Sequence, residues 1–250
     1  MWALWGAGMG DGRELAWDGC FNVRDLGGIA VPGGMVTRPG AVVRSDNPER
    51  LTRAGWAALT AHGVRTIVDL RNDGEHQGDL WMRPAEVTTV RVRLDDTEDV
   101  ELWDHIRANE LDGTPLYYRL FLERKPRLCA EVIAAIANAR PGGVLFHCGL
   151  GRDRTGMIAL LLLALVGAAP EDIAADYDQS TNRLPPLFAA LAIEDQTREI
   201  EDILARKKTT ARAAVLAALD GFDAEAYVRA AGLTEEEVGF LRERLLEPAR

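Results

Sequence analysis

Lysine is scarce in this chain. Its 250 residues include only Lys125, Lys207 and Lys208, and the formal net charge is −10 at pH 7. Nucleic acids and anionic membrane surfaces are bound by clusters of basic side chains, which a chain of this charge balance does not offer. We therefore expect no nucleic acid and no anionic membrane among its partners.

Long hydrophobic runs are also missing. The apolar run of residues 158–169 is shorter than the about 20 residues that span a bilayer, so it predicts a core helix and no stable membrane insertion. Residues 1–10 are apolar, but no basic region precedes them and they contain three glycines, which is a poor match to a signal peptide. We interpret residues 1–18 as an N-terminal arm that is flexible or docks.

Cysteines are few and odd in number. Cys20, Cys129 and Cys148 have neither the paired spacing of a disulfide framework nor the spacing of a metal site. We expect no cofactor and no metal, and we interpret Cys20 and Cys129 as ordinary buried thiols. A reactive thiol needs reducing conditions, so a cytoplasmic location is expected, while secretion without a signal peptide stays open.

The composition predicts one folded domain over residues 1–250, with 47% hydrophobic and 27% charged residues. Strands alternate with helices, and from Leu184 onward every predicted element is helical. The predicted strands cover residues 28–31, 35–37, 66–70, 87–94 and 143–146, and the predicted helices cover residues 51–62, 116–122, 127–139, 157–166, 193–208 and 211–219, with a further helix beginning at Pro170. This pattern predicts a three-layer α/β fold around a small, mostly parallel sheet.

Residues 147–156, with the sequence HCGLGRDRTG, are the most informative segment. They place the thiol of Cys148 six positions before the guanidinium of Arg154, between a predicted strand and a predicted helix. Glycines in such a loop let successive backbone N–H groups point inward at an anion, the helix N-terminus adds positive charge, and Arg154 can bind two phosphoryl oxygens. The predicted phosphate-binding residues are Gly149, Leu150, Gly151, Arg152 and Arg154.

The same positive groups favour the thiolate form of Cys148, which is the attacking species. Attack on phosphorus would form a cysteinyl-phosphate that water then hydrolyses. A merely structural Cys148 would require the rest of the motif to agree by accident. The loop therefore predicts a metal-independent phosphomonoester hydrolase.

The loop resembles that of the cysteine-dependent phosphatases with a Cys-x5-Arg motif, and more narrowly that of the bacterial atypical tyrosine and lipid phosphatases. The similarity extends from about Phe21 to about Leu246 and is carried by residues 22–28, 43–46, 51–52, 63–75, 175–180 and 231–234. It implies a protein-tyrosine-phosphatase-like fold with extra C-terminal helices. It also implies a phosphorylated protein or a phosphoinositide as substrate, with phosphotyrosine tried first; a non-catalytic phosphate-binding module is the alternative from another class.

Arg152 stands where that family usually has lysine, a residue associated there with polyanionic phosphoinositides. We expect Arg152 to adjust the preference for substrate charge without being essential. The resemblance also makes residues 193–219 the place to look for a helical lid over the pocket; plain packing of these helices on the sheet is the alternative.

Several carboxylates could protonate the leaving oxygen. The resemblance favours Asp153 inside the loop, whereas the wider group of phosphatases keeps its acid on a separate loop, which here would be Asp95 or Asp96 after the strand of residues 87–94. Residues 95–99 are also a charge run of the kind that is often only a solvated loop.

The supporting residues are predicted as follows. Thr155 is expected to hydrogen-bond the sulfur or to cap the helix. His147 is expected to order the loop as a hydrogen-bond donor rather than to act as a base. Arg24 and Asp25 are expected to form a buried pair that braces the loop, and a structural role is favoured for Asp69 and Arg71 at the end of a strand.

Overall fold

A five-stranded sheet forms the centre of the protein, whose structure is a computed structural model. The structure describes residues 12–76 and 83–249. The strand order is β1-β4-β7-β5-β6, in which β1 is antiparallel to β4 and the other neighbours are parallel. The strands are β1 (Arg24–Asp25), β4 (Val42–Ser45), β7 (Gly143–His147), β5 (Val64–Asp69) and β6 (Thr88–Arg91). The predicted small, mostly parallel sheet is confirmed.

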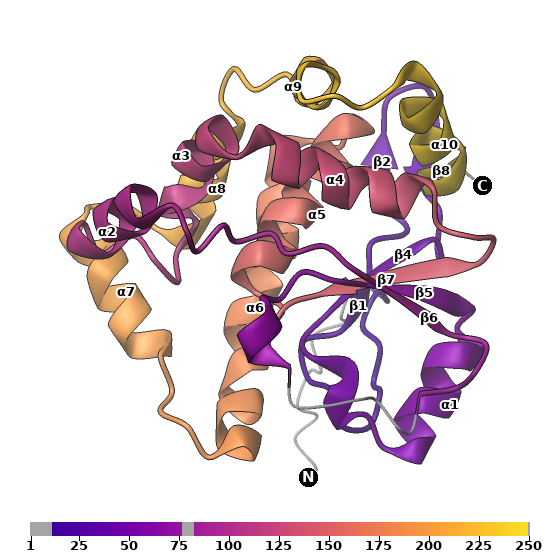
Figure 1. Cartoon of the computed structure of the whole chain (residues 1–250), viewed down its shortest axis with the longest axis horizontal. Coiled ribbons are helices and arrows are strands. Elements are labelled where there is room, and N and C mark those ends of the chain that lie inside the picture. The colour runs from indigo at the N-terminus through magenta and orange to yellow at the C-terminus, as the bar shows by residue number, and fades with distance from the viewer. Residues whose placement is uncertain (1–11, 77–82, 250) are drawn as a thin grey trace, which may run out of the picture.

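Both faces of the central strand β7 are covered, because every one of its residues is buried. This explains its continuous apolar sequence, which is typical of a parallel strand buried on two sides. Val144 and Phe146 belong to the large core on one face, while Leu145 belongs to a second core that includes Trp56 of α1 (Arg53–Ala61) and Trp17. Figure 1 shows the resulting three layers, with α1 on one side of the sheet and α4 and α5 on the other.

The remaining helices surround this centre (Figure 1). They are α2 (Val100–Ala108), α3 (Tyr118–Arg124), α4 (Pro126–Ala137), α5 (Asp153–Leu165), α6 (Pro170–Leu191), α7 (Thr197–Arg206), α8 (Ala211–Leu219), α9 (Ala224–Ala230) and α10 (Glu235–Leu245), with the single turns η1 (Pro48–Arg50), η2 (Asp73–Glu75) and η3 (Pro115–Tyr117). Helix α5 is apolar on all sides because almost all of it is buried. Within the described residues no helix is long and apolar enough to cross a membrane.

The prediction that the C-terminal third is entirely helical is wrong at its end. After α10 the chain becomes extended and forms β8 (Leu246–Pro248), which pairs with β3 (Met35–Thr37) in an antiparallel sheet of order β2-β3-β8, with β2 being Ala30–Val31. The carbonyls of Leu245 and Leu246 accept hydrogen bonds from Arg38, which fixes this ending. The pairing partner lies more than 200 residues away, so no local pattern could indicate it.

The helical predictions also need correction. Helix α2 was not predicted, because only Leu102 and Ile106 of its nine residues are buried and they give a weak periodicity. The helix predicted from residue 193 begins only at Thr197, because Ala192 adopts a left-handed conformation that ends α6. Helices α7 and α8 have their main contacts with α6, α3 and η3 and not with the sheet, on which packing was one of the two alternatives for residues 193–219.

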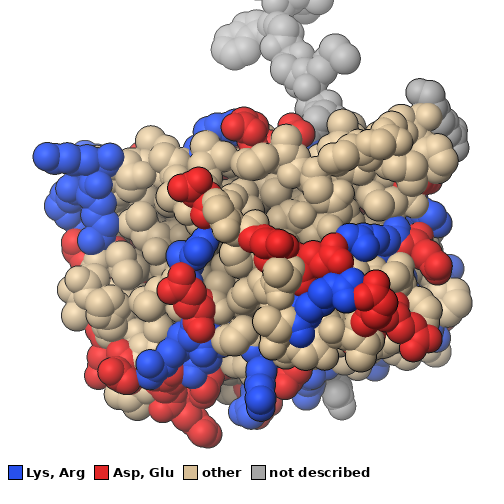
Figure 2. All heavy atoms as spheres, turned by 90° about the horizontal axis from the view of Figure 1, so that it is seen from above, with Lys and Arg blue, Asp and Glu red and all other residues tan. Residues whose placement is uncertain are grey.

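Part of the N-terminal arm is docked in the structure. Glu14 forms an antiparallel bridge with Arg24 at the sheet edge, and Trp17 is buried. Residues 1–11 of the predicted arm lie outside the described residues. On the face of the molecule seen in Figure 2, acidic and basic side chains are interspersed over a largely uncharged surface.

Candidate active site

The loop between β7 and α5 lies at the carboxyl edge of the sheet, which is where α/β proteins usually form their ligand sites. Strand register determines what it meets there: Ser45 at the end of β4 and Asp69 at the end of β5 both pair with His147. The segments that follow these two strands therefore flank Cys148.

Three successive carbonyl groups of the loop accept hydrogen bonds from residues of the surrounding protein. The backbone N–H of Asn47 donates to the carbonyl of Gly149 over 3.1 Å, the side chain of Asn22 donates to Leu150 over 3.0 Å, and Nη2 of Arg44 donates to Gly151 over 2.8 Å. By contrast, the backbone N–H groups of residues 149–152 donate to no group of the described residues. These amides form an anion cradle next to the start of α5.

Gly151 is required for this shape. Its φ of 70° lies in the left-handed region, and a Cβ added there would lie 2.5 Å from the carbonyl oxygen of Ser45. Any larger residue would therefore push the loop away from β4.

A buried carboxylate on α6 supports the loop through two arginines. Asp176 accepts from Nε of Arg24 over 2.9 Å and from Nη1 of Arg44 over 2.5 Å, and all three side chains are buried. Burial alone would raise the pKa of Asp176, but the charges of Arg24 and Arg44 outweigh it and lower that pKa well below its usual range. Arg44 reaches both this carboxylate and the carbonyl of Gly151, so the ion network fixes the loop.

The predicted pair of Arg24 and Asp25 is therefore wrong. Adjacent residues of a strand point to opposite faces, so the two side chains cannot meet. Asp25 instead accepts from the backbone of Gly27 and Gly40 and contacts Nε2 of His62 at 2.8 Å. It organises a turn, while Arg24 braces the loop with a partner 152 residues away.

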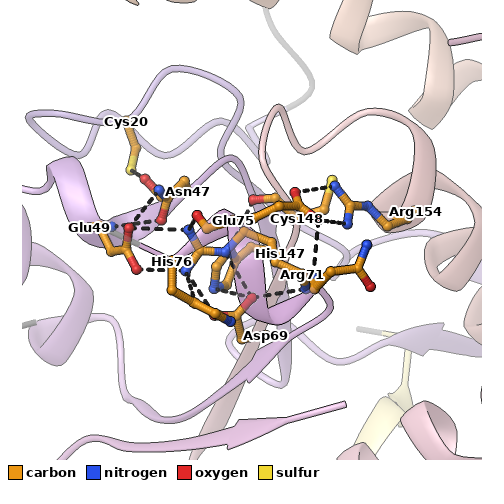
Figure 3. A network of polar contacts seen from close by, with 11 residues as sticks. Cys20, Asn47, Glu49, Asp69, Arg71, Glu75, His76, His147, Cys148 and Arg154 are labelled. Atoms are coloured by element: carbon orange, nitrogen blue, oxygen red, sulfur yellow. Dashed lines mark hydrogen bonds and ion pairs between the residues drawn. The ribbon is translucent and has the colours of Figure 1, made fainter. Parts of the chain in front are cut away.

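Asp69 and Arg71, for which the sequence favours a structural role, form a buried ion pair. Arg71 binds Asp69 over 2.9 Å and Glu49 over 2.6 Å, in the network drawn in Figure 3. Burial would raise the pKa of Asp69, but the hydrogen bonds from Arg71 lower it. Through its contact with Glu49, Arg71 connects the end of β5 to η1.

His147 is a neutral donor in this network. Its burial lowers the pKa of the ring to about 4. Nδ1 lies 3.0 Å from the carbonyl oxygen of Cys148, and because a carbonyl can only accept, we assign the proton to Nδ1. This agrees with the expected ordering role and not with a role as base.

Arg154 is held by two carboxylates. Glu75 accepts from Nη1 and Nη2 over 2.6 and 2.7 Å, and Oδ2 of Asp95 lies 3.1 Å from Nη1. Nε makes no hydrogen bond within the described residues and stays available to a phosphoryl oxygen. Figure 3 shows Arg154 beside Cys148 with Glu75 reaching it. Glu75 was noted in the sequence only as part of a family motif, and its role at the site was missed.

The three candidate acids differ in environment. Burial is the main reason why the pKa of Asp95 rises to about 6, although Arg154 opposes the shift. Asp96 is bound by Lys125 over 2.8 Å, which lowers its pKa. Asp153 accepts from Nε of Arg152 over 3.1 Å. Asp95 therefore combines contact with Arg154 and a raised pKa.

Arg152 and Thr155 differ from expectation. Arg152 is only 6% exposed, and besides Asp153 it reaches Oε1 of Gln196 over 3.4 Å, just before α7. Thr155 is buried, yet its hydroxyl makes no hydrogen bond to Cys148 or any other described residue. It lies inside the first turn of α5 and not at the preceding position, so it cannot cap this helix either.

The other two cysteines lie apart from the chemistry. Cys20 donates from Sγ to the carbonyl of Asn47 over 3.5 Å, and burial raises its pKa well above the usual range. Burial raises the pKa of Cys129 to about 12. Both thiols therefore remain protonated and unreactive.

Comparisons with known proteins show which family the chain resembles. The sequence profile of the tyrosine phosphatase family matches residues 15–247. A Cupriavidus necator protein predicted to be a tyrosine-protein phosphatase is 36% identical over 180 residues, which cover 68% of this chain and 64% of that protein. The triple specificity protein phosphatase PtpB of Mycobacterium tuberculosis is 29% identical, covering 92% of this chain and 93% of that protein. Among solved structures, TpbA of P. aeruginosa matches with a TM-score of 0.39 and 18% identity, covering 84% of this chain and 98% of that one.

Proposed function

Because the chain belongs to the tyrosine phosphatase family, we propose that it hydrolyses phosphomonoesters through a covalent intermediate on Cys148. The observation that carries this proposal is the cradle of free backbone amides at residues 149–152, with Cys148 at one end and Arg154 at the other. Such a cradle binds the three non-bridging oxygens of a phosphate group and favours the thiolate beside it.

The reaction has two steps. The thiolate of Cys148 attacks phosphorus, the bond between phosphorus and the ester oxygen breaks, and an acid donates its proton to the departing oxygen. A water molecule then attacks the cysteinyl-phosphate and gives one proton to the carboxylate left by the first step, the phosphorus–sulfur bond breaks, and inorganic phosphate leaves with the thiolate and the acid regenerated. Arg154 and the loop amides hold the phosphoryl oxygens in both steps.

Asp95 is the acid in this proposal. A general acid must carry a proton when the substrate is bound, and a pKa of about 6 keeps more of Asp95 protonated near neutral pH than the lowered pKa of Asp96 does for that residue. Asp153, which the resemblance favours, is engaged by Arg152 and supports the loop through its carbonyl, which accepts from Oη of Tyr118 over 2.8 Å. Exchange of each aspartate for asparagine decides between them: loss at the acid grows as the leaving group becomes poorer, whereas loss at a supporting residue does not.

Phosphotyrosine is the substrate class in this proposal, and a phosphoinositide is the alternative. A phosphoinositide head group offers further phosphates, and Arg152 is the residue expected to bind them. Its guanidinium is instead buried and bound to Asp153 and Gln196, which favours the singly phosphorylated substrate. The name of PtpB, triple specificity protein phosphatase, says that this relative acts on more than one kind of substrate, so both substrate classes are tested.

The decisive experiment is turnover on a panel of phosphotyrosine peptides, phosphoinositides and sugar phosphates. Cys148→Ser serves as the blank, because a hydroxyl is not ionised at neutral pH. We expect no turnover in this variant with an unchanged fold, and competitive inhibition of the wild type by vanadate. Full activity of Cys148→Ser would overturn the covalent mechanism, and loss of activity with EDTA would indicate a metal-dependent hydrolase.

A further inference from the structure

Tyr117 is a buried aromatic residue that the mechanism above leaves unused. It is the last residue of η3, and its side chain is 4% exposed. Tyr118 meets its ring edge-on with centroids 5.3 Å apart, and the rings of Trp103 and Phe121 lie 6.3 and 6.2 Å away. Three aromatic neighbours therefore fix the direction of the ring.

The hydroxyl of Tyr117 differs from those of Tyr118 and Tyr227 in having no partner among the described residues. Buried Tyr177 likewise makes no hydrogen bond from its hydroxyl within the described residues, but the charges that act on it are those of Asp153, Arg152, Arg44 and Asp178. Oη of Tyr118 donates to the carbonyl of Asp153 over 2.8 Å, and Oη of Tyr227 donates to Leu122 over 2.9 Å. Oη of Tyr117 makes no hydrogen bond within the part of the chain that the structure describes, and it is not among the polar atoms sealed from solvent without a partner. A buried tyrosine normally has a partner for its hydroxyl, so this one is available to a bound molecule.

The surroundings of this hydroxyl are those of the active site. The charges that act on Tyr117 are those of Asp153, Asp95, Arg154 and Cys148. Burial, the largest influence, raises the pKa of Tyr117 well above its usual range, so the hydroxyl keeps its proton and remains a donor.

Trp103 connects Tyr117 to the loop of the proposed acid. Its indole N–H donates to the carbonyl of Asp96 over 2.7 Å, directly after Asp95, while its ring packs against Tyr117. Trp103 therefore positions both the hydroxyl of Tyr117 and the loop that carries Asp95.

We propose that the hydroxyl of Tyr117 donates a hydrogen bond to the ester oxygen of the bound phosphomonoester, which leaves with the alcohol. This inference rests on the proposed function. The ester oxygen gains negative charge as its bond to phosphorus breaks, so a fixed donor there stabilises the transition state more than the ground state. No proton is transferred from Tyr117, which assists the acid and does not replace it.

The test is Tyr117→Phe, which removes the hydroxyl and keeps the ring. A hydrogen bond to a charged group contributes about 1.5 to 3 kcal/mol, which corresponds to a roughly 10- to 100-fold lower kcat for phenyl phosphate. We expect a loss of less than about 3-fold for nitrophenyl phosphate, whose leaving group departs with little assistance.

Tyr227→Phe is the matched control, since it removes a tyrosine hydroxyl far from the loop. Equal losses of Tyr117→Phe on both substrates, or an unchanged kcat on phenyl phosphate, would overturn the inference. If Cys148→Ser keeps full activity, the proposed function fails; if only the Tyr117 variant behaves like the wild type, the proposed function stands and this inference fails.

Discussion

Exchange of Asp95 for asparagine should stabilise the protein at alkaline pH while lowering its activity. Burial raises the pKa of Asp95 from its ordinary 3.8 to about 6, so between these values the folded protein binds a proton that the unfolded chain has released. The free energy of unfolding therefore falls as the pH rises through this window, and the cost is complete above pH 6. Asparagine does not titrate and removes this cost.

The size of the effect follows from the shift. A difference of about two pKa units corresponds to about 3 kcal/mol. For a protein of this length, that change moves the melting temperature by roughly 6 to 12 °C. Urea unfolding of the wild type and of Asp95→Asn at pH 4 and pH 8 measures it, with the exposed Asp73→Asn as control, because the Asp73 side chain is 77% exposed.

Relative to the wild type, the free energy of unfolding of Asp95→Asn should therefore rise by about 3 kcal/mol between pH 4 and pH 8, while that of Asp73→Asn stays nearly constant. On poor leaving groups we expect the activity of the wild type to fall above about pH 6, and Asp95→Asn should lose this fall. A relative stability of Asp95→Asn that does not change with pH would refute the desolvation of this carboxyl. An unchanged pH profile would refute its role as the acid.

Three further outcomes are expected. Glu75→Gln should lower kcat/KM about tenfold, because Arg154 loses its orienting partner; tighter phosphate binding in this variant would show instead that Glu75 competes with phosphate. Asp176→Asn should lower the free energy of unfolding, measured in urea, by about 3 to 5 kcal/mol, because it leaves the buried Arg24 and Arg44 unpaired. A small effect, equal to that of the half-exposed Asp178→Asn, would contradict the stabilising role of Asp176. Arg152→Ala should reduce turnover of phosphoinositides and of phosphotyrosine peptides equally, since its guanidinium is bound within the protein; a loss confined to phosphoinositides would restore its predicted role in charge preference.

The parts of the site that could be predicted are those that are contiguous in sequence. Strand β7, the loop and α5 follow one another directly, so their apolar runs and glycines indicate the anion cradle without knowledge of the fold. The position of this loop at the carboxyl edge of a parallel sheet also follows from the alternation of strands and helices.

The parts that could not be predicted depend on pairs distant in sequence. Arg24 was assigned to its neighbour Asp25, but its partner is Asp176 on another element. Glu75 and Arg154 are 79 residues apart, and no spacing rule connects them. The distinction between Asp95 and Asp96 is likewise a matter of burial, because one faces Arg154 and the other faces Lys125.

These pairings also explain how a chain with a net charge of −10 can hold a dianionic group. Five arginines around the loop face six carboxyl groups of the protein, of which Asp95 carries a proton in the proposed mechanism. Arg24 and Arg44 contact Asp176, Arg71 contacts Asp69 and Glu49, Arg152 contacts Asp153, and Arg154 contacts Glu75 and Asp95. Attraction of phosphate therefore cannot come from an excess of basic side chains. It has to come from the backbone amides of residues 149–152 and the free edge of Arg154, whose partial charges are fixed by the loop and cost no reorganisation. A site built in this way recognises one phosphate group at short range, which is why the scarcity of lysine is compatible with phosphate chemistry.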